Sequence, residues 1–334
     1  MSSPSIPTIL VTGGAGFLGS HLCEVLVQHA NVVCIDNFST GQSAHIQKLL
    51  QHPRFEFLRH DISEPLDLSA HRELSRFQIG IHGIQQIYHL ASSSAEKAFD
   101  QHRLSMLRTG SEGFRHVLEL AREYQATVLL VSTSELYEEQ DAPFLAESDR
   151  CWTDHFGERA AYQEAKRYEE TLLHTYASVY GFRAKIARLF FSYGPRMAMQ
   201  DDQLLPTMIQ AALRHESVEL PYSEDARLSL CYVQDVVDGL VRFMQHDRDI
   251  RVMNIGSDQE TRLGLVAERI LQLTQSPSRL HFSVHGSRRV SAVPNIDKAR
   301  QLLHWLPLTR LDDGLRHVIE YARSKQQEYN VFSA

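Results

Sequence analysis

Two side chains four residues apart, Tyr162 and Lys166, could carry out acid–base chemistry in this sequence. On a helix that spacing places both side chains on one face. A free phenol has a pKa of about 10 and is a poor base at neutral pH, but a neighbouring ammonium stabilises the phenolate and lowers that pKa. The pair could therefore act as a general base near neutral pH, although a tyrosine and a lysine at this spacing also occur by chance.

A second group of polar side chains ends an apolar segment at residues 131–135 (VSTSE). The carboxyl end of a strand is where α/β sheets place the groups that contact ligands. Thr133 could hydrogen-bond a substrate hydroxyl or ketone, and Glu135 could act as an acid, a base or an electrostatic element. Together with the first pair, these residues predict a catalytic site made of Thr133, Glu135, Tyr162 and Lys166.

A glycine-rich segment near the N-terminus, residues 12–19 (TGGAGFLG), follows a strand candidate and precedes an amphipathic helix candidate. In a dinucleotide-binding loop the first glycine permits the tight turn, the second lets the backbone approach a pyrophosphate, and the third allows close helix packing. The phosphates then lie at the positive end of the helix dipole. The cofactor contacts expected here are Gly13, Gly16, Phe17, Leu18 and Gly19.

Asp36 ends the second apolar segment, about 20 residues after the glycines, where an acidic group binds the hydroxyls of the adenosine ribose. Its carboxylate would repel a 2′-phosphate, and residues 37–41 offer no Arg or Lys to receive one, so NAD is favoured over NADP. Asp61, at the end of the third segment, could hydrogen-bond the adenine amino group. The other cofactor contacts are expected from Asn37, Ile62, Leu90, Tyr162 and Lys166.

Short apolar segments alternate with longer helical segments over the first 190 residues. These are the elements that must position the residues named above. This alternation is typical of βαβ units and of a parallel sheet covered on both faces, so the sequence predicts an α/β fold with a Rossmann-type doubly wound parallel sheet. We expect an NAD-binding domain at residues 1–190 and a smaller mixed α/β lobe at 191–334, mainly for substrate and interleaved with the first domain. The expected strands cover residues 8–11, 32–35, 55–59, 86–90, 128–131 and 184–190, and the expected helices cover 17–29, 104–124 and 160–180.

The composition is that of an ordinary globular chain: of 334 residues, 43% are hydrophobic and 22% are charged, which excludes a disordered or coiled-coil protein. The net charge of −7 provides no basic field for a polyanion, so nucleic acid is not an expected partner. The cysteines are far apart and the histidines are scattered, so we expect no metal site. The sequence shows neither a signal peptide nor an apolar stretch able to span a membrane, and we expect a cytoplasmic protein.

Several motifs, in their order along the chain, resemble those of the extended short-chain dehydrogenase/reductases, in the nucleotide-sugar epimerase/dehydratase group. They are TGGAGFLG, Asp36, a strand ending in HLAS, STSELY, the YxxxK pair and RLFFSYGPRM. The segments DNFSTG, HPRFEFLRHDI, YGPRM and CYVQDVVDGLVRFM are more closely similar to the UDP-glucuronate decarboxylases. The likeness runs from Thr8 to Tyr321, nearly the whole chain.

This resemblance implies a closed redox cycle, with NAD as cofactor and a nucleotide sugar as substrate. Tyr162, kept phenolate-like by Lys166, would take the proton from a sugar C4 hydroxyl while hydride passes to NAD⁺, and Thr133 would orient the C4 oxygen. The C4 ketone makes a C5 carboxylate a β-keto acid that loses CO₂; Glu135 would assist around C5, and the retained NADH would reduce the ketone. The resemblance also implies a homodimer formed through the helices at 104–124 and 164–180.

The chain departs from these relatives where they hold the substrate's anionic groups. Phe191 stands in place of an Asn, and Leu228 stands in place of an Arg, with Arg227 one position away. Asn295 replaces an Asp in the segment AVPNI, and Gly110 replaces an Asn of the cofactor region. The remaining candidates for substrate contacts are Ser134, Arg159, Arg196 and Arg227.

Three functions stay open on these residues. Decarboxylation of UDP-glucuronate follows from the resemblance, whereas the lost anion contacts leave room for 4-epimerisation or for redox chemistry on a different substrate. Ser134 stands where the 4,6-dehydratases have an Asp that protonates the leaving hydroxyl, which counts against dehydration. The third function is a non-catalytic NAD-binding sensor or scaffold, and the intact Tyr162, Lys166 and Thr133 argue against it because a sensor needs none of them.

Overall fold

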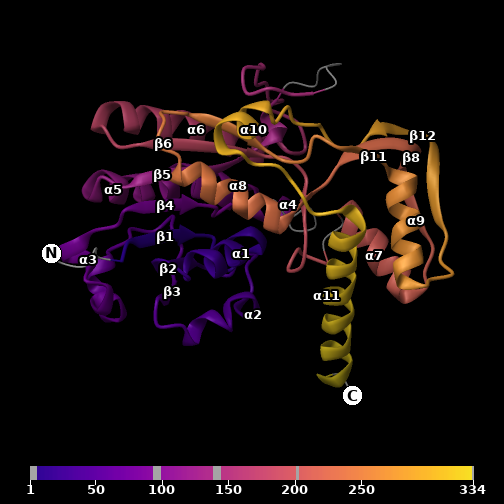
Figure 1. Ribbon diagram of the computed structural model, residues 1–334, viewed down its shortest axis with the longest axis horizontal. Coiled ribbons are helices and arrows are strands. Elements are labelled where there is room, and N and C mark those ends of the chain that lie inside the picture. Colours follow the sequence, from indigo (N-terminus) through magenta and orange to yellow (C-terminus); the bar gives the residue numbers. More distant parts are fainter. Residues whose placement is uncertain (1–5, 93–98, 138–143, 201–202, 333–334) are drawn as a thin grey trace.

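A seven-stranded parallel sheet forms the centre of the computed structural model, which describes residues 6–92, 99–137, 144–200 and 203–332 (Figure 1). The strand order is β10-β6-β5-β4-β1-β2-β3, and each neighbouring pair runs parallel. The order reverses between β1 and β4, and ligands bind outside the carboxyl ends of the strands at such a reversal. The strands are β1 Thr8–Thr12, β2 Asn31–Asp36, β3 Phe55–Arg59, β4 Gln86–His89, β5 Thr127–Thr133, β6 Ala184–Leu189 and β10 Val252–Ile255.

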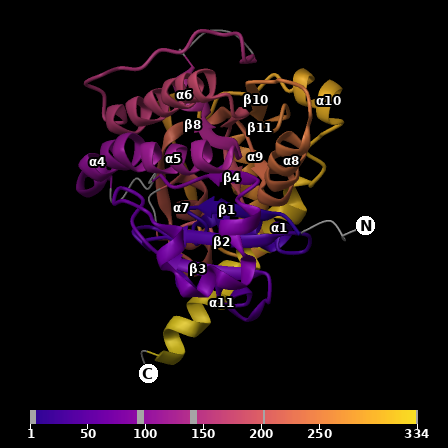
Figure 2. The same cartoon turned by 90° about the vertical axis from the view of Figure 1, so that its left-hand side faces the viewer.

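Helices cover both faces of this sheet, as Figure 2 shows from one side. Within β1, Ile9 and Val11 belong to the apolar cluster formed with α1 and α8, while Leu10 belongs to the cluster formed with α5 and α6. A strand buried on both faces reads as a nearly continuous apolar run, which is why residues 9–11 of β1 are all apolar. The covering helices are α1 Phe17–Leu26, α4 Phe99–Arg108, α5 Phe114–Tyr124, α6 Ala160–Tyr180 and α8 Val233–Gln245.

The segment predicted as one helix over 104–124 is instead two helices, α4 and α5, joined by a π-helical turn at Thr109–Gly113. Gly110 in this turn is buried and packs closely against α6. The approach is so close that a Cβ at this position would lie only 2.9 Å from the Cβ of Ala165. A π turn holds an extra residue and shifts the helical face. The single-helix prediction was therefore wrong at this point, next to the helix that carries Tyr162.

The smaller lobe lies beside the central sheet (Figure 1) and is built on a mixed sheet of order β11-β8-β12. Strand β8 runs antiparallel to β11 and parallel to β12, which confirms the mixed α/β lobe. Its elements are β8 Val218–Ser229, β11 Glu260–Arg262, β12 Leu280–Arg289, α7 Leu204–Arg214, α9 Leu263–Thr274 and α11 Leu311–Phe332. Shorter elements are β7 Ser192–Tyr193, β9 Cys231–Tyr232, α2 Ser43–Ile46, α3 Ile79–His82, α10 Asp297–Leu303 and the 3₁₀ helices Leu49–Gln51, Leu68–Ala70, Arg72–Phe77 and Ser134–Leu136.

Residues 191–334 contribute to both parts of the molecule. Strand β10 pairs with β6 and extends the central sheet, and α8 packs on both of these strands. The chain therefore returns to the first part after entering the smaller lobe. None of the described helices is both long and apolar enough to cross a membrane.

Candidate active site

A cavity of about 1850 Å³ follows the carboxyl ends of the central strands and is also lined by residues of α7 and β8 from the smaller lobe. It brings together all the predicted site residues except Arg227. Those that line it are Gly13, Gly16, Phe17, Leu18, Gly19, Asp36, Asn37, Asp61, Ile62, Leu90, Thr133, Ser134, Glu135, Arg159, Tyr162, Lys166 and Arg196.

The glycine loop after β1 leaves backbone rather than side chains facing this cavity. Gly13 has a φ of 71°, in the left-handed region that favours glycine, and a Cβ there would lie 2.7 Å from the backbone nitrogen of Ala91. A Cβ on Gly19 would overlap the carbonyl oxygen of Gly13. Helix α1 begins at Phe17 with no side chain capping its N-terminus, so its first amides remain available to an anion such as a diphosphate.

Asp36, at the end of β2, is 8% exposed and its carboxylate is fixed by two backbone amides. It accepts hydrogen bonds from the amide nitrogens of Ala15 at 3.0 Å and Phe38 at 2.8 Å. Burial raises the pKa of Asp36, and these two hydrogen bonds oppose the rise. A carboxylate has about four acceptor sites, so the side chain can still receive hydrogen bonds from ribose hydroxyls in the cavity.

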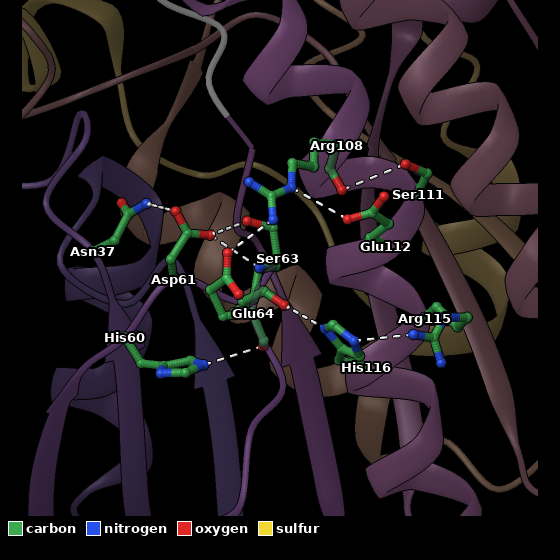
Figure 3. Close-up of polar contacts among 11 residues, drawn as sticks. Asn37, His60, Asp61, Ser63, Glu64, Arg108, Ser111, Glu112, Arg115 and His116 are labelled. Carbon is green, nitrogen blue, oxygen red and sulfur yellow. Dashed lines mark hydrogen bonds and ion pairs between the residues drawn. The ribbon is translucent and has the colours of Figure 1, made fainter.

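Asp61 is the centre of a polar network beside the cavity (Figure 3). One carboxylate oxygen accepts hydrogen bonds from the Ser63 amide at 2.9 Å and the Ser63 hydroxyl at 2.6 Å, and the other accepts one from Asn37 Nδ2 at 3.0 Å. Partial burial raises the pKa of Asp61, but the hydrogen bonds from Ser63 and Asn37 outweigh it and leave the pKa below its ordinary value. Asn37 and Asp61, both predicted cofactor contacts, are thus held together.

Arg108 is a cavity residue that sequence reasoning missed. Its guanidinium pairs with Glu64 at 2.8 Å and with Glu112 at 3.2 Å (Figure 3). It lies on α4, far along the chain from the glycine loop, and no motif in that part of the sequence signals a ligand contact. Trp152, also in the cavity wall and 60% exposed, was missed for the same reason.

Tyr162 lies on α6, 8% exposed, close to Thr133 at the end of β5. Burial raises the pKa of Tyr162, and the negative charge of Glu135 adds to the rise. The hydrogen bond with Thr133 and the positive charge of Arg159 act in the opposite direction. The guanidinium carbon of Arg159 lies 4.9 Å from the centre of the Tyr162 ring. The phenol is therefore placed between one acidic and one basic side chain.

Glu135 and Arg159 are joined by two parallel hydrogen bonds. Arg159 Nε donates to one carboxylate oxygen of Glu135 at 3.0 Å, and Nη2 donates to the other at 2.7 Å. The Glu135 amide also donates to Thr133 Oγ1 at 3.2 Å. Bidentate pairs fix geometry as well as charge, so the carboxylate of Glu135 is held in one orientation beside Tyr162.

Lys166 is buried behind Tyr162, and its ammonium donates to two groups. Nζ lies 3.0 Å from the carbonyl oxygen of Val131 in β5 and 2.8 Å from the Glu169 carboxylate one turn later on α6. The YxxxK pair predicts an effect of Lys166 on Tyr162, and the contact of Lys166 with Glu169 is seen only in the structure. The YxxxK spacing carries no information about a third side chain beneath the pair.

Two predicted substrate contacts, Arg227 and Arg196, and one position that differs from the relatives, Asn295, lie in different surroundings. Arg227 is exposed on β8 and is not among the described residues that line the cavity, whereas its neighbour Leu228 is buried in the core. Arg196 lines the cavity and pairs with Glu24 on α1. Asn295 accepts a hydrogen bond from the amide of Asp297 at 2.8 Å, next to the start of α10, through its side-chain oxygen.

The comparison with known proteins agrees with this geometry. The sequence matches the NAD dependent epimerase/dehydratase family over residues 9–256. The chain belongs to this family. Its cofactor is accordingly NAD, and it is an enzyme of the epimerase/dehydratase type.

Relatives within this family are similar over nearly the whole chain. UDP-glucuronic acid decarboxylase 6 of Arabidopsis thaliana is 35% identical over 313 residues, covering 92% of this chain and 86% of its own. UDP-glucuronic acid decarboxylase 1 of Xenopus tropicalis is 34% identical, covering 95% and 72%. The solved UDP-glucuronic acid 4-epimerase of Bacillus cereus, in complex with UDP-glucuronic acid and NAD, superposes with a TM-score of 0.81 at 25% identity, over 95% of this chain and 99% of that one.

The residues of this epimerase/dehydratase family member fit NAD. The tight turn of the loop admits no Cβ at Gly13 or Gly19, the N-terminus of α1 is uncapped by side chains, and Asp36 offers free acceptor sites. NAD supplies reversible hydride transfer when it is bound. We propose that the glycine loop holds its diphosphate and Asp36 its adenosine ribose, and that Lys166 also contacts the cofactor.

Replacing Asp36 with Ala is expected to weaken NAD binding by about 10- to 100-fold, the value of a hydrogen bond to a charged group. NADP binding should weaken less or improve, because the variant no longer repels a 2′-phosphate. Isothermal titration with both cofactors measures the ratio of the two affinities. Simple distortion of the loop would weaken both cofactors alike, and an unchanged ratio would contradict the ribose assignment.

Proposed function

We propose that this protein decarboxylates UDP-glucuronate through a transient C4 ketone and keeps its NAD throughout the cycle. The observation that carries the proposal is the meeting of Tyr162, Thr133 and Glu135 in the cavity that the dinucleotide loop also lines. The named decarboxylases that cover 92% to 95% of this chain support the choice of substrate.

The first half of the reaction needs a base and a group that orients the sugar. The Tyr162 phenolate oxygen takes the proton of the C4 hydroxyl, and the Thr133 hydroxyl hydrogen-bonds the same C4 oxygen. Burial and the charge of Glu135 disfavour the phenolate, whereas the hydrogen bond with Thr133 and the positive charge of Arg159 favour it. We expect the Lys166 ammonium to add to this second effect.

In the second half, the C4 ketone lies β to the carboxylate carried by C5. When CO₂ leaves, the electron pair of the broken bond moves into the ketone as an enolate, and C5 then takes up a proton. Glu135, held beside Tyr162 by Arg159, is the group we assign to proton transfer at C5. Tyr162 finally returns its proton to the C4 oxygen as the ketone is reduced.

The experiment that tests the reaction is incubation of the protein with NAD⁺ and UDP-glucuronate, followed by mass spectrometry and measurement of CO₂ release. Decarboxylation gives a product lighter by the mass of CO₂, with little net NADH. A product of unchanged mass and inverted C4 configuration would instead support 4-epimerisation, the activity named for the structural neighbour from Bacillus cereus. No turnover with NAD bound would move the proposal to a different substrate.

Arg159 is the cation we expect to meet the substrate carboxylate, since it lines the cavity beside Tyr162. Arg159→Ala should raise the KM for UDP-glucuronate by about 10- to 100-fold, because a charged hydrogen bond is lost. It should also lower kcat, because Glu135 and Tyr162 lose the guanidinium beside them. Arg227→Ala is the matched control, since Arg227 is exposed outside the described cavity wall, and its KM should not change. Steady-state kinetics measure KM for UDP-glucuronate in both variants. A KM that rises only in Arg227→Ala would contradict the assignment of Arg159.

The resemblance to relatives that pair through two helices supports a homodimer. Large apolar side chains are exposed on the helices in question, with Leu104 on α4 at 83% and Val179 on α6 at 66%. Covering such side chains with a second copy would remove them from water.

We place the enzyme in the cytoplasm, where nucleotide sugars and NAD are available to it.

A further inference from the structure

A buried cluster of ionisable side chains lies near Tyr162, one to two turns further along α6 and at the end of β4. Lys166 and Glu169 on α6 are 2% and 0% exposed, and His89 at the end of β4 is 0% exposed. These side chains do not form a surface ion pair, because solvent does not reach the Glu169 carboxylate or the His89 imidazole. Each charge in the cluster must therefore be balanced by another protein group.

The contacts show which groups balance one another. Lys166 Nζ has three donors, of which one goes to the Val131 carbonyl and one to Glu169 Oε2. His89 Nδ1 lies 2.8 Å from Thr12 Oγ1, and its Nε2 lies 4.0 Å from Glu169 Oε1. Neither His89 Nε2 nor Glu169 Oε1 has a hydrogen-bond partner among the described residues.

The charge on Glu169 is balanced by Lys166 rather than by His89. Burial, together with the nearby charge of Lys166, lowers the pKa of His89 well below its ordinary value, so the imidazole is neutral. Burial raises the pKa of Glu169, the Lys166 ammonium opposes that rise, and the charge of Glu170 adds to it. The ammonium that is expected to favour the Tyr162 phenolate is thus shared with an acid.

Gly110 provides the space that the Glu169 side chain uses. A Cβ at Gly110 would lie 3.1 Å from Glu169 Oε1 and 2.9 Å from the Cβ of Ala165. The π-helical turn, the missing side chain at Gly110 and the buried carboxylate of Glu169 are therefore parts of one local arrangement.

We propose that Glu169 is a positioning residue of the catalytic site: its carboxylate holds the Lys166 ammonium against β5 and offsets the positive charge that Tyr162 experiences. Thr133 and Glu135, from β5 and the turn after it, and Arg159, just before α6, also act on Tyr162, and Lys166 lies one turn further along α6 in the same cavity wall. Glu169 acts with Glu135 to disfavour the phenolate, and Arg159 acts against it. The inference deepens the proposed function, since it assigns the group that sets the pH at which Tyr162 can accept a proton.

The test is Glu169→Gln, which keeps the size of the side chain and an oxygen for Lys166 but removes the charge. In the NAD-loaded protein without sugar, the phenolate absorbance of Tyr162 is titrated as the difference from Tyr162→Phe. We expect the midpoint to fall by about one pH unit, the lower end of the effect of one nearby charge, and the acid limb of kcat/KM for UDP-glucuronate to move with it. Asp238→Asn, which removes a charge from an exposed pair with Arg242 on α8, should shift neither.

An unchanged midpoint in Glu169→Gln, or a higher one, would overturn the proposal. If Glu169→Gln does not fold, Lys166→Met is compared with Lys166→Met/Glu169→Gln, because the double variant no longer buries an unpaired charge. Compared with Lys166→Met, the double variant should unfold at a higher temperature and its phenolate midpoint should lie at a lower pH. A lower unfolding temperature and a higher midpoint in the double variant would also overturn the proposal. Because the titration uses no sugar, its result is independent of whether UDP-glucuronate is the substrate.

Discussion

Tyr162→Phe is expected to lower turnover of UDP-glucuronate by about 10²- to 10⁴-fold, the usual contribution of a general base. The substitution removes only the hydroxyl, and the ring keeps its buried position on α6 beside Met106. The Lys166 contacts with Val131 and Glu169 involve no atom of Tyr162, so NAD should bind as before. Product formation by mass spectrometry and NAD binding by calorimetry measure the two effects separately.

A matched control lies on the same helix. Tyr176 donates a hydrogen bond to Glu119 at 3.0 Å and lies outside the cavity, so Tyr176→Phe removes a hydroxyl from α6 without touching the site. It should retain full turnover. Undiminished activity in Tyr162→Phe would remove the central assignment of the site, and loss of activity in both variants would point to general damage to α6.

Gly19→Ala is expected to abolish detectable NAD binding and to destabilise the fold by about 1–3 kcal/mol, the cost typical of overpacking. The added methyl group would overlap the carbonyl oxygen of Gly13 and approach the Cα of Gly14 at 2.7 Å. Both obstacles are backbone atoms, so no side-chain rotation can relieve the overlap. The glycine loop must move, and the loop is the surface we expect to hold the diphosphate.

Gly80→Ala is the control for this substitution, because no described residue outside its own helical turn has an atom within 4 Å of a Cβ at Gly80, and the residue has no positive φ. Thermal unfolding and NAD titration of the two variants should differ sharply, with Gly80→Ala close to the parent protein. Normal NAD affinity in Gly19→Ala would show that the cofactor does not rest on this loop.

The dinucleotide half of the site could be predicted from the sequence because it depends on local features. The glycines of residues 12–19 and Asp36 belong to consecutive elements, and the parallel sheet brings their ends together whatever the rest of the chain does. The Tyr162 and Lys166 pair is also local, since one helix carries both. Motifs confined to one βαβ unit or one helix need no knowledge of distant contacts.

The surroundings of the catalytic pair could not be predicted in the same way. Gly110 and Glu169 are far apart in sequence and meet only because a π turn lies against α6. Arg227 and Leu228 show a second difficulty, since neighbours on a strand point to opposite faces. Which of the two faces outward depends on the register of β8 with β11 and β12, and the sequence does not state that register.

The return of β10 to the central sheet has a consequence for synthesis of the chain. Until residues 252–255 leave the ribosome, β6 is an open edge strand, and Lys185 lacks the Phe243 and His246 carbonyls to which it donates in the finished protein. An inward-pointing charge on an open edge discourages pairing with another chain. We therefore expect Lys185 to hinder such pairing until α8 and β10 cover it, and a polypeptide ending at residue 190 would keep that edge permanently exposed.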